Sequence, residues 1–376
     1  MDFSFTDEQA MLRDSVARYL EKNYDFDRRK TIVSQGYSKE VWRDFADQGL
    51  LALPFPEDVG GFGGTIVDIV SIAELFGERL VIEPYCSSIL LAGNALARAG
   101  RTEPLRSLVT RIVAGECLAA FAHEEGAGLA DPALVALRAT ATEGLYRLDG
   151  EKRYVLGGAQ ADVLVVSVRI SGSPGDTAGL ALIALRPDHA GVHVTPFQTI
   201  DGRAAAHIRF NGVEFSGDAI LSTDAHDIVA AVIRDATITL CAEGVGAMGA
   251  LLSATANYAS TRRQFGVPIG SFQAVAHRLA DMKIAYAKAR STLLYTTALA
   301  EAGRVAPRDI SILKGQIGRL GISLAEAAVQ THGGIGMTDE LAVGHYLKRL
   351  LAIDVMFGAS DYHFRLVGKG SFEAAA

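Results

Sequence analysis

The N-terminal third of the chain repeats apolar side chains at helical spacing. Thr6 and Gln9 form a capping-box pattern, and Leu12 begins a run of apolar residues with a period close to that of an α-helix. The pattern predicts helices from this point to about Cys117. The turn-rich stretch LPFPEDVGGFGG at 53–64 is expected to interrupt them.

Between about 118 and 220 the pattern changes to that of β-strands. The runs DVLVVSVRI at 162–170 and GLALIAL at 179–185 are rich in aliphatic and β-branched residues. We expect a hairpin turn at Asp149–Gly150 and a second turn at Asn211–Gly212. Consecutive strands joined by such turns predict an antiparallel sheet and exclude a doubly wound parallel one.

Helical spacing returns after Asp224 and continues nearly to the end of the chain, with breaks at 266–270, 303–307 and 333–336. The order of helices, strands and helices predicts an α+β fold. Three domains are expected in this order, namely an N-terminal helical domain, a middle β domain and a C-terminal four-helix-type bundle, over 1–117, 118–225 and 226–376.

Composition narrows the possible partners. The formal net charge is −7 and no basic block occurs, so we expect no nucleic-acid partner. No uncharged apolar stretch of about 18 residues is present, so we expect no membrane span. Three widely separated cysteines favour a reducing cytoplasm. His189 and His193 have a metal-like spacing but lack a third ligand, so no metal is expected.

The stretch TRRQFGVPIGSFQ at 261–273 joins two predicted helices with more turn residues than a simple stop requires. Gly266, Pro268 and Gly270 break the helical pattern, while Arg262, Phe265 and Gln273 lie around them. A cation, an aromatic ring and an amide at one helix junction indicate a contact with something outside it. Helix capping by Arg262 is the alternative interpretation.

A second unusual stretch is HGGIGM at 332–337, which follows Gln330 on a predicted helix. Gly333 and Gly334 would let a ligand approach the backbone closely, and the Gln330 amide both donates and accepts hydrogen bonds. The stretch follows a helix instead of a strand, so it is not a dinucleotide-binding fingerprint. An ordinary helix stop would also explain it.

Together these two stretches resemble the signatures of the acyl-CoA dehydrogenase family. The similarity extends over essentially the whole chain and includes FPEDVGGFGG at 55–64 and LYRLDGEKRYVLGGAQADVLVV at 145–166. The order of helices, strands and helices is also that of the family.

The resemblance implies a flavoprotein that desaturates an acyl-CoA thioester between its α and β carbons. In the family a carboxylate removes the α-proton, hydride passes to FAD, and the electrons leave to an electron-transfer flavoprotein. The family also implies that one subunit contacts the FAD of its neighbour. The residues carried over to this contact are Arg262, Phe265, Gln273, Gln330, Gly333 and Gly334.

Two departures from the family concern the base. Many members carry a glutamate just before the glycine of the motif that here reads VMFGASDYHF, and this chain has Phe357 there. A second branch places its glutamate on the helix before RRQFG, near Ala256 in this chain. Asp361 could serve as a relocated catalytic base, although an aspartate there could equally cap a helix or face water.

Two further departures affect the segments that face the flavin in the family. Glu124 stands where a threonine usually contacts the flavin ring, and a carboxylate there would repel the reduced, electron-rich ring. The family's tryptophan-isoleucine-threonine reads Tyr154, Val155 and Leu156 here. The chain's own flavin site therefore looks impaired, whereas its contacts to a neighbour's flavin look intact.

A chain with an impaired flavin site of its own, intact contacts to a neighbour's flavin and no base resembles the small subunits of heterotetrameric bacterial members of the family. These include enzymes that act on pimeloyl-CoA and on steroid side chains. The resemblance implies a partner subunit that supplies the base, and a role in the degradation of fatty acids or steroids. Three alternatives remain. They are a self-sufficient homo-oligomeric dehydrogenase with a relocated base, a related flavin oxidase or monooxygenase, and a flavin-free scaffold.

Overall fold

The structure, a computed structural model, describes residues 5–100, 102–126 and 131–373. The chain forms two compact units, each built from separate segments of the sequence. Unit 1 comprises Met1–Thr31, Thr65–Val81 and Thr237–Ala376, and unit 2 comprises Ile32–Gly64 and Ile82–Ala236. The predicted order of helices, strands and helices is observed. The division into 1–117, 118–225 and 226–376 stays a prediction.

The described residues of unit 1 are helical apart from one small hairpin. Its elements are α1 (Asp7–Asn23), the start of α2 (Phe26–Gln35), α4 (Ile66–Arg79), most of α7 (His226–Thr261), β9 (Arg263–Gln264), β10 (Val267–Pro268), η4 (Ile269–Ser271), α8 (Gln273–Glu301), α9 (Pro307–His332), η5 (Gly333–Met337), α10 (Ala342–Val355) and α11 (Ser360–Glu373). The predicted capping box begins α1, because the Thr6 hydroxyl accepts from the Gln9 amide at 3.2 Å and the Gln9 side chain accepts from the Thr6 amide at 3.1 Å.

Two helices of unit 1 cross at a pair of glycines. A Cβ on Gly77 of α4 would lie 1.8 Å from the carbonyl oxygen of Glu243, and a Cβ on Gly246 of α7 would lie 1.8 Å from that of Glu74. No larger residue fits either position without moving a backbone. Arg349 of α10 forms a buried bidentate ion pair with Glu243, with N–O distances of 2.8 and 2.6 Å.

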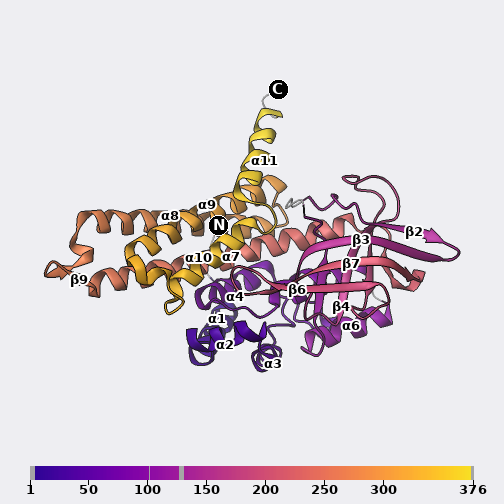
Figure 1. Cartoon of the computed structure of the whole chain (residues 1–376), viewed down its shortest axis with the longest axis horizontal. Helices are drawn as coiled ribbons and strands as arrows, with labels where there is room; N and C mark the ends of the chain where they lie inside the picture. Colours follow the sequence, from indigo (N-terminus) through magenta and orange to yellow (C-terminus); the bar gives the residue numbers. More distant parts are fainter. Residues whose placement is uncertain (1–4, 101, 127–130, 374–376) are drawn as a thin grey trace. The chain divides into compact units, whose positions relative to one another are not determined.

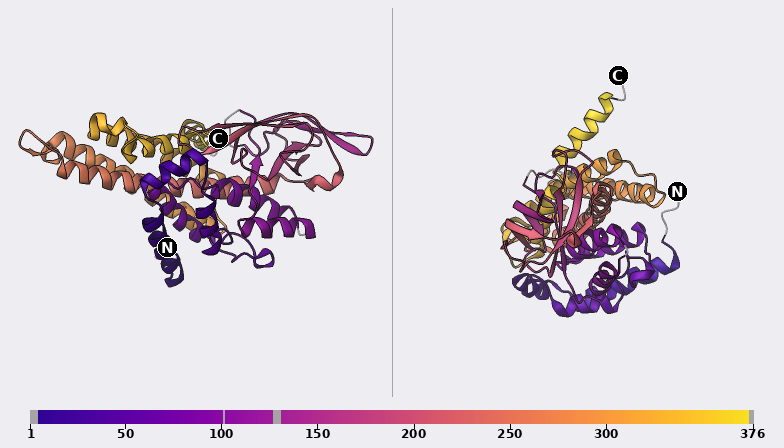
Figure 2. Two further views of the ribbon diagram at one scale, coloured as in Figure 1. Left: turned by 60° about the horizontal axis from the view of Figure 1, so that its bottom comes forward. Right: turned by 90° about the vertical axis from the view of Figure 1, so that its right-hand side faces the viewer.

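Helix α9 is the central helix of the C-terminal bundle and packs against α8, α10 and α11. Figure 1 shows α8, α9 and α10 side by side, while α11 leads away from them. The β9–β10 hairpin lies at the far end of α7 and α8 in both Figure 1 and the left view of Figure 2. This places the sequence 262–272 at the tip of a long helical pair.

Unit 2 contains the sheet and several short helices. Its elements are the end of α2, α3 (Lys39–Asp47), η1 (Glu57–Val59), η2 (Tyr85–Gly93), α5 (Asn94–Ala99), α6 (Glu103–Val113), β1 (Ala119–Ala122), β2 (Arg138–Thr142), β3 (Leu145–Leu156), β4 (Val163–Arg169), β5 (Leu180–Leu185), β6 (Val192–Gln198), β7 (Ala204–Phe215), η3 (Gly217–Ala219), β8 (Ile220–Ser222) and the start of α7.

The sheet has the strand order β6-β7-β3-β2-β4-β5-β8, and β1 pairs with β4. The expected antiparallel pairing holds for most neighbours, but β1 and β2 both pair with β4 in parallel. Along β7 buried Ile208 and Phe210 alternate with exposed His207 and Arg209, so one face of this part of the sheet is buried. The buried face contributes to an apolar core with Leu148, Val155 and Leu164.

The two predicted turns were wrong. Asp149–Gly150 lies inside the long strand β3, and Asn211–Gly212 lies inside β7, which pairs with β3. The register shifts at this point, so that two residues of β7 face one residue of β3 in a β-bulge. The Asp149 carboxylate accepts from the Gly212 amide at 2.7 Å. Asp149, Asn211 and Gly212 therefore form a β-bulge between two paired strands and do not reverse the direction of the chain.

Among the described residues, none of the helices combines the length and apolar composition that crossing a bilayer would require.

Candidate functional site

The tip of the α7–α8 pair is a two-residue hairpin. Gln264 pairs with Val267, and the two residues between them, Phe265 and Gly266, have φ of +52° and +85°. Both central residues of a type I′ turn need positive φ, a conformation that costs roughly 1 kcal/mol or more for a residue with a Cβ. The Phe265 side chain is nevertheless 93% exposed. A strained aromatic residue without burial in its own chain indicates a function outside that chain.

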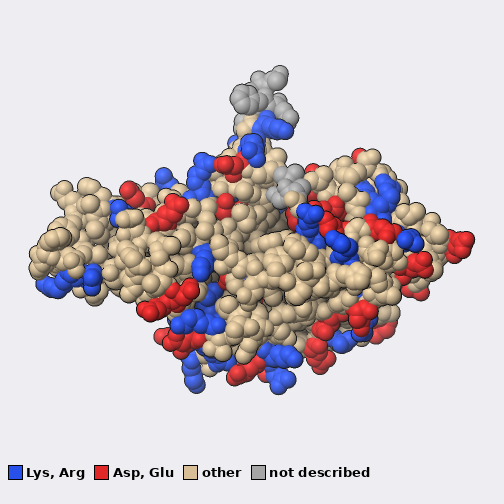
Figure 3. Space-filling model, viewed as in Figure 1, with Lys and Arg blue, Asp and Glu red and all other residues tan. Residues whose placement is uncertain are grey.

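The polar residues around the hairpin are also exposed. Arg262 directly follows α7, and Gln273 begins α8. Within the described part of the chain, the Arg262 guanidinium has no hydrogen-bond or ion-pair partner, so it does not cap α7 through a carbonyl. Figure 3 shows cations along the lower edge of this tip and mostly uncharged surface elsewhere on it. The tip therefore offers a cation, an amide and an aromatic ring to a ligand.

The end of α9 offers open backbone. Gly333 has φ +66° and its amide caps the helix by donating to the Val329 carbonyl. A Cβ on Gly334 would meet no atom within 4 Å, and Gly334 does not have positive φ. Neither packing nor backbone conformation within this chain requires a glycine at 334. Gln330, one turn earlier, is exposed. Open glycine backbone beside an exposed amide fits the approach of a flat group from outside.

The usual position of the base carries no carboxylate. Phe357 has φ +54° and its carbonyl accepts from His363 at 2.8 Å. The buried Lys314 ammonium donates to the carbonyls of Asp354 and Gly358, both at 2.7 Å, and this burial lowers the Lys314 pKa. These contacts fix the backbone at position 357 but add no proton acceptor there.

The two other positions considered for the catalytic base are those of Ala256 and Asp361. Ala256 is an exposed residue of α7. Asp361 lies in the first turn of α11 and forms an ion pair with Arg319 at 2.8 Å, and both side chains are largely exposed. These surroundings favour the interpretation of Asp361 as a solvated residue at a helix start.

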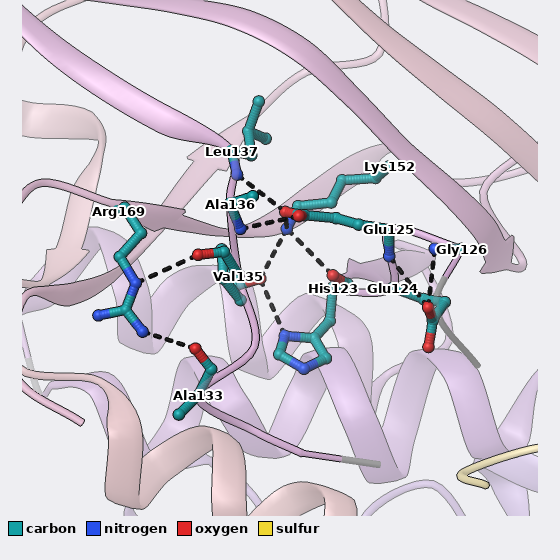
Figure 4. Close-up of polar contacts among 11 residues, drawn as sticks. His123, Glu124, Glu125, Gly126, Ala133, Val135, Ala136, Leu137, Lys152 and Arg169 are labelled. Carbon is teal, nitrogen blue, oxygen red and sulfur yellow. Dashed lines mark hydrogen bonds and ion pairs between the residues drawn. The ribbon is translucent and has the colours of Figure 1, made fainter. Parts of the chain in front are cut away.

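Unit 2 contains the residues at the positions that the family resemblance assigns to the flavin ring, and Figure 4 shows one of them, Glu124. One Glu124 carboxylate oxygen accepts from the backbone amides of Glu125 and Gly126, at 3.1 and 2.8 Å. Tyr154 has φ +54° within β3, and its ring lies 6.0 Å from that of Phe197. The Glu124 side chain therefore bonds to amides that follow it in its own chain.

Next to Glu124 lies a buried ionic network that the sequence analysis missed. The fully buried Lys152 ammonium donates to Glu125 at 2.6 Å, to the Ser167 hydroxyl at 3.1 Å and to the His123 carbonyl at 3.0 Å. Burial lowers the Lys152 pKa to about 8, although the Glu125 carboxylate opposes this shift. Burial and the Lys152 charge lower the His123 pKa to about 3.

This network holds the segment that leads into β2. Glu125 accepts from the amides of Ala136 and Leu137 at 2.8 and 3.0 Å. The buried Arg169 guanidinium binds the same segment from its other side, by donating to the Ala133 and Val135 carbonyls (Figure 4). The sequence offered one sign of this network, because Lys152 is a charged residue at an inward-facing position of a predicted strand.

The histidines at 189 and 193 do not form a metal site in the described chain, where no group of three or more histidine, cysteine or acidic side chains is placed to bind a metal ion.

Comparisons with known proteins identify the family of this chain. The sequence profile of the acyl-CoA dehydrogenase N-terminal domain matches residues 6–116, and that of the acyl-CoA dehydrogenase C-terminal domain matches residues 228–372. Together the two matches cover more than half of the chain. A relative, Acyl-CoA dehydrogenase FadE27 of Mycobacterium tuberculosis, is 29% identical over 353 residues, which are 92% of this chain and 91% of that protein.

Solved structures share the fold over nearly the full length. The ChsE4-ChsE5 complex from Mycobacterium tuberculosis aligns with a TM-score of 0.88 at 27% identity and covers 99% of both chains. PigA with FAD and proline aligns with a TM-score of 0.89 at 25% identity and covers 98% of this chain and 99% of that chain. The two matched domains and the shared fold show that this chain belongs to the acyl-CoA dehydrogenase family, whose members are flavin-dependent oxidoreductases.

Proposed function

We propose that this chain is the base-lacking subunit of a hetero-oligomeric acyl-CoA dehydrogenase and completes the FAD site of a related chain. The observation that carries the proposal is Phe265, a strained and 93% exposed aromatic residue beside the exposed Arg262. The similar ChsE4-ChsE5 structure is by its title a complex of two proteins, which supports the same kind of assembly here.

The proposed FAD contacts follow from the chemistry of each group. Arg262 would bind a pyrophosphate oxygen pair through its planar guanidinium. Phe265 would lie against a flat ring, and Gln273 and Gln330 would supply amide hydrogen bonds. Gly333 and Gly334 would admit the nucleotide close to the backbone. Bound FAD supplies the hydride acceptor for α,β-desaturation of an acyl-CoA.

The absence of a carboxylate at Phe357 and Ala256 supports a partner that supplies the base. Removal of an α-proton needs an acceptor within hydrogen-bond reach, and Asp361 is held in a solvated ion pair with Arg319. The partner would therefore contribute the glutamate, whereas this chain would contribute binding groups. By analogy with the family, the assembly would be a tetramer and its electrons would pass to an electron-transfer flavoprotein.

The test compares the chain alone with the chain co-expressed with a related chain that carries the glutamate. Flavin absorbance, mass by light scattering and acyl-CoA-dependent dye reduction are measured on both preparations. We expect bound FAD and turnover only in the mixed assembly. Full flavin occupancy and turnover of the chain alone would favour the self-sufficient enzyme, and peroxide formation in air without a dehydrogenase reaction would favour the oxidase.

A matched pair of variants tests the contact itself. Arg262→Ala should weaken FAD binding by the mixed assembly about tenfold to a hundredfold, because a hydrogen-bonded charge contributes about 1.5–3 kcal/mol. Arg304→Ala is the control, since Arg304 is an exposed arginine beyond the opposite end of α8. Equal FAD affinity in the two variants would contradict the proposed contact and favour the scaffold.

A further inference from the structure

The two segments proposed to bind FAD are joined by a pair of stacked rings. Tyr258 lies on the last turns of α7, and His332 is the last residue of α9. Their ring centroids are 4.4 Å apart with an interplanar angle of 24°. The His332 side chain is buried, and Tyr258 is partly buried. The stack therefore connects the end of α7 to the end of α9 within unit 1.

Each ring lies directly beside one of the proposed FAD-binding segments. The Tyr258 carbonyl accepts from the Arg262 amide at 2.8 Å, so Tyr258 lies one helical turn before that arginine. A Cβ on Gly270 would lie 3.1 Å from the carbonyl oxygen of Ala259, so the η4 turn that follows the hairpin packs against the residue after Tyr258. A shift of Tyr258 would therefore be transmitted to the hairpin.

On the other helix, His332 immediately precedes Gly333. Its Nδ1 lies 2.9 Å from the Ala328 carbonyl, which can only accept, so Nδ1 carries the proton and the ring orientation is set. A Cβ on Gly336 would lie 2.9 Å from the Cβ of His332, so the η5 turn folds closely over this side chain. The turn that contains Gly333 and Gly334 thus begins at His332 and packs against it.

We propose that Tyr258 and His332 are positioning residues, whose stack holds the Arg262–Phe265 corner and the Gly333–Gly334 backbone in one arrangement for a flavin nucleotide. This inference rests on the proposed function. Neither ring has to touch the ligand. The stack acts by keeping two segments that are distant in the sequence at a fixed separation, so that both can contact one rigid nucleotide at once.

The experiment measures FAD affinity of the mixed assembly after removal and titration of FAD, by quenching of flavin fluorescence. His332→Ala and Tyr258→Ala should weaken binding roughly fivefold to tenfold. His332→Phe and Tyr258→Phe retain a ring and should restore most of the affinity. Asn257→Ala changes an exposed residue of the same helix turn and is the control.

A double variant separates positioning from general structural support. If Tyr258 acts through Arg262, Tyr258→Ala should weaken FAD binding less in an Arg262→Ala background than in the wild type. Additive losses, or alanine variants that lower the melting temperature while FAD affinity stays unchanged, would overturn the inference. If Arg262→Ala weakens binding and the stack variants do not, only this inference fails. If Arg262→Ala also has no effect, the proposed function fails with it.

Discussion

At the scale of single residues, His123 and Lys152 place two ionisable groups in one buried network. His123 Nδ1 lies 2.9 Å from the Ser167 hydroxyl, and the Lys152 ammonium donates to the same hydroxyl. The imidazole also stacks on Phe121, with centroids 5.5 Å apart. A second positive charge here would lie close to Lys152, and the imidazole therefore stays neutral in the folded protein.

Acid should destabilise the protein through His123. The folded pKa of His123 is about 3 and its ordinary value is 6.5, so only the unfolded chain takes up the proton between these pH values. The stability that depends on a neutral His123 is fully present above about pH 6.5 and is lost as the pH falls toward 3. The free energy of unfolding decreases by at most about 1.4 kcal/mol per pH unit in this range.

Urea unfolding at pH 7 and pH 5 measures this effect. The loss of unfolding free energy between the two pH values should be smaller for His123→Phe than for the wild type. His193→Gln alters an exposed histidine of β6 and should behave like the wild type. An identical pH dependence for His123→Phe and the wild type would contradict the assignment of His123 as a buried neutral group.

Asp361 is the second residue-scale prediction. Because its carboxylate is exposed and paired with Arg319, Asp361→Asn should leave turnover of the mixed assembly within about twofold of the wild type. Loss of a true general base would reduce the rate by about 10²-fold or more. Steady-state kinetics at saturating acyl-CoA distinguishes the two, and a large decrease would restore Asp361 as the base.

At the scale of elements, the crossing of α4 and α7 depends on two glycines. Gly246→Ala would place a methyl group 1.8 Å from the Glu74 carbonyl, and backbone at a helix crossing cannot yield as a flexible side chain can. The variant should lose about 3 kcal/mol of unfolding free energy, at the upper end for overpacking.

Gly368→Ala is the matched control for this substitution. Gly368 lies in α11, where an added Cβ would meet no atom within 4 Å, so alanine should stabilise the helix by about 0.5–1 kcal/mol. Chemical unfolding of both variants gives the comparison. If the two substitutions changed stability alike, the close approach of α4 and α7 would not exist in solution.

At the scale of the whole molecule, Phe265 should have opposite effects on the folding of the isolated chain and on FAD binding by the proposed mixed assembly. The residue costs stability in the isolated chain because its φ is +52°, and its exposed ring regains little there beyond an edge contact with Phe272. Phe265→Gly should therefore keep or raise the unfolding free energy of the isolated chain by up to about 1 kcal/mol. In the mixed assembly the same variant should weaken FAD binding about tenfold.

Calorimetry of the isolated chain and FAD titration of the assembly measure the two effects separately. Phe272→Ala is a useful comparison, because Phe272 contacts the Phe265 ring edge but has ordinary negative φ. A Phe265→Gly chain that was less stable and bound FAD normally would show that the ring serves the fold of the hairpin.

The sequence by itself determined the order of elements and the position of the corner at 262–273. These features rest on local chemistry. The Thr6–Gln9 capping box closes within one helical turn. Pro268 lacks an amide hydrogen and its ring clashes with a preceding helical turn, and Gly266 adopts the positive φ of a turn at no steric cost. The resemblance carried by the same residues gave the family, which the domain matches confirm.

The tertiary structure decided what depends on residues distant in the chain. Asp149–Gly150 has the composition of a turn, yet β7 supplies hydrogen bonds along its length and converts it into part of a bulge. The burial of Lys152 and the stacking of Tyr258 on His332 arise only when separate elements meet. The conformational preferences of single residues contribute less free energy than packing and strand pairing between distant segments. Only the folded chain therefore shows which local preferences are overridden.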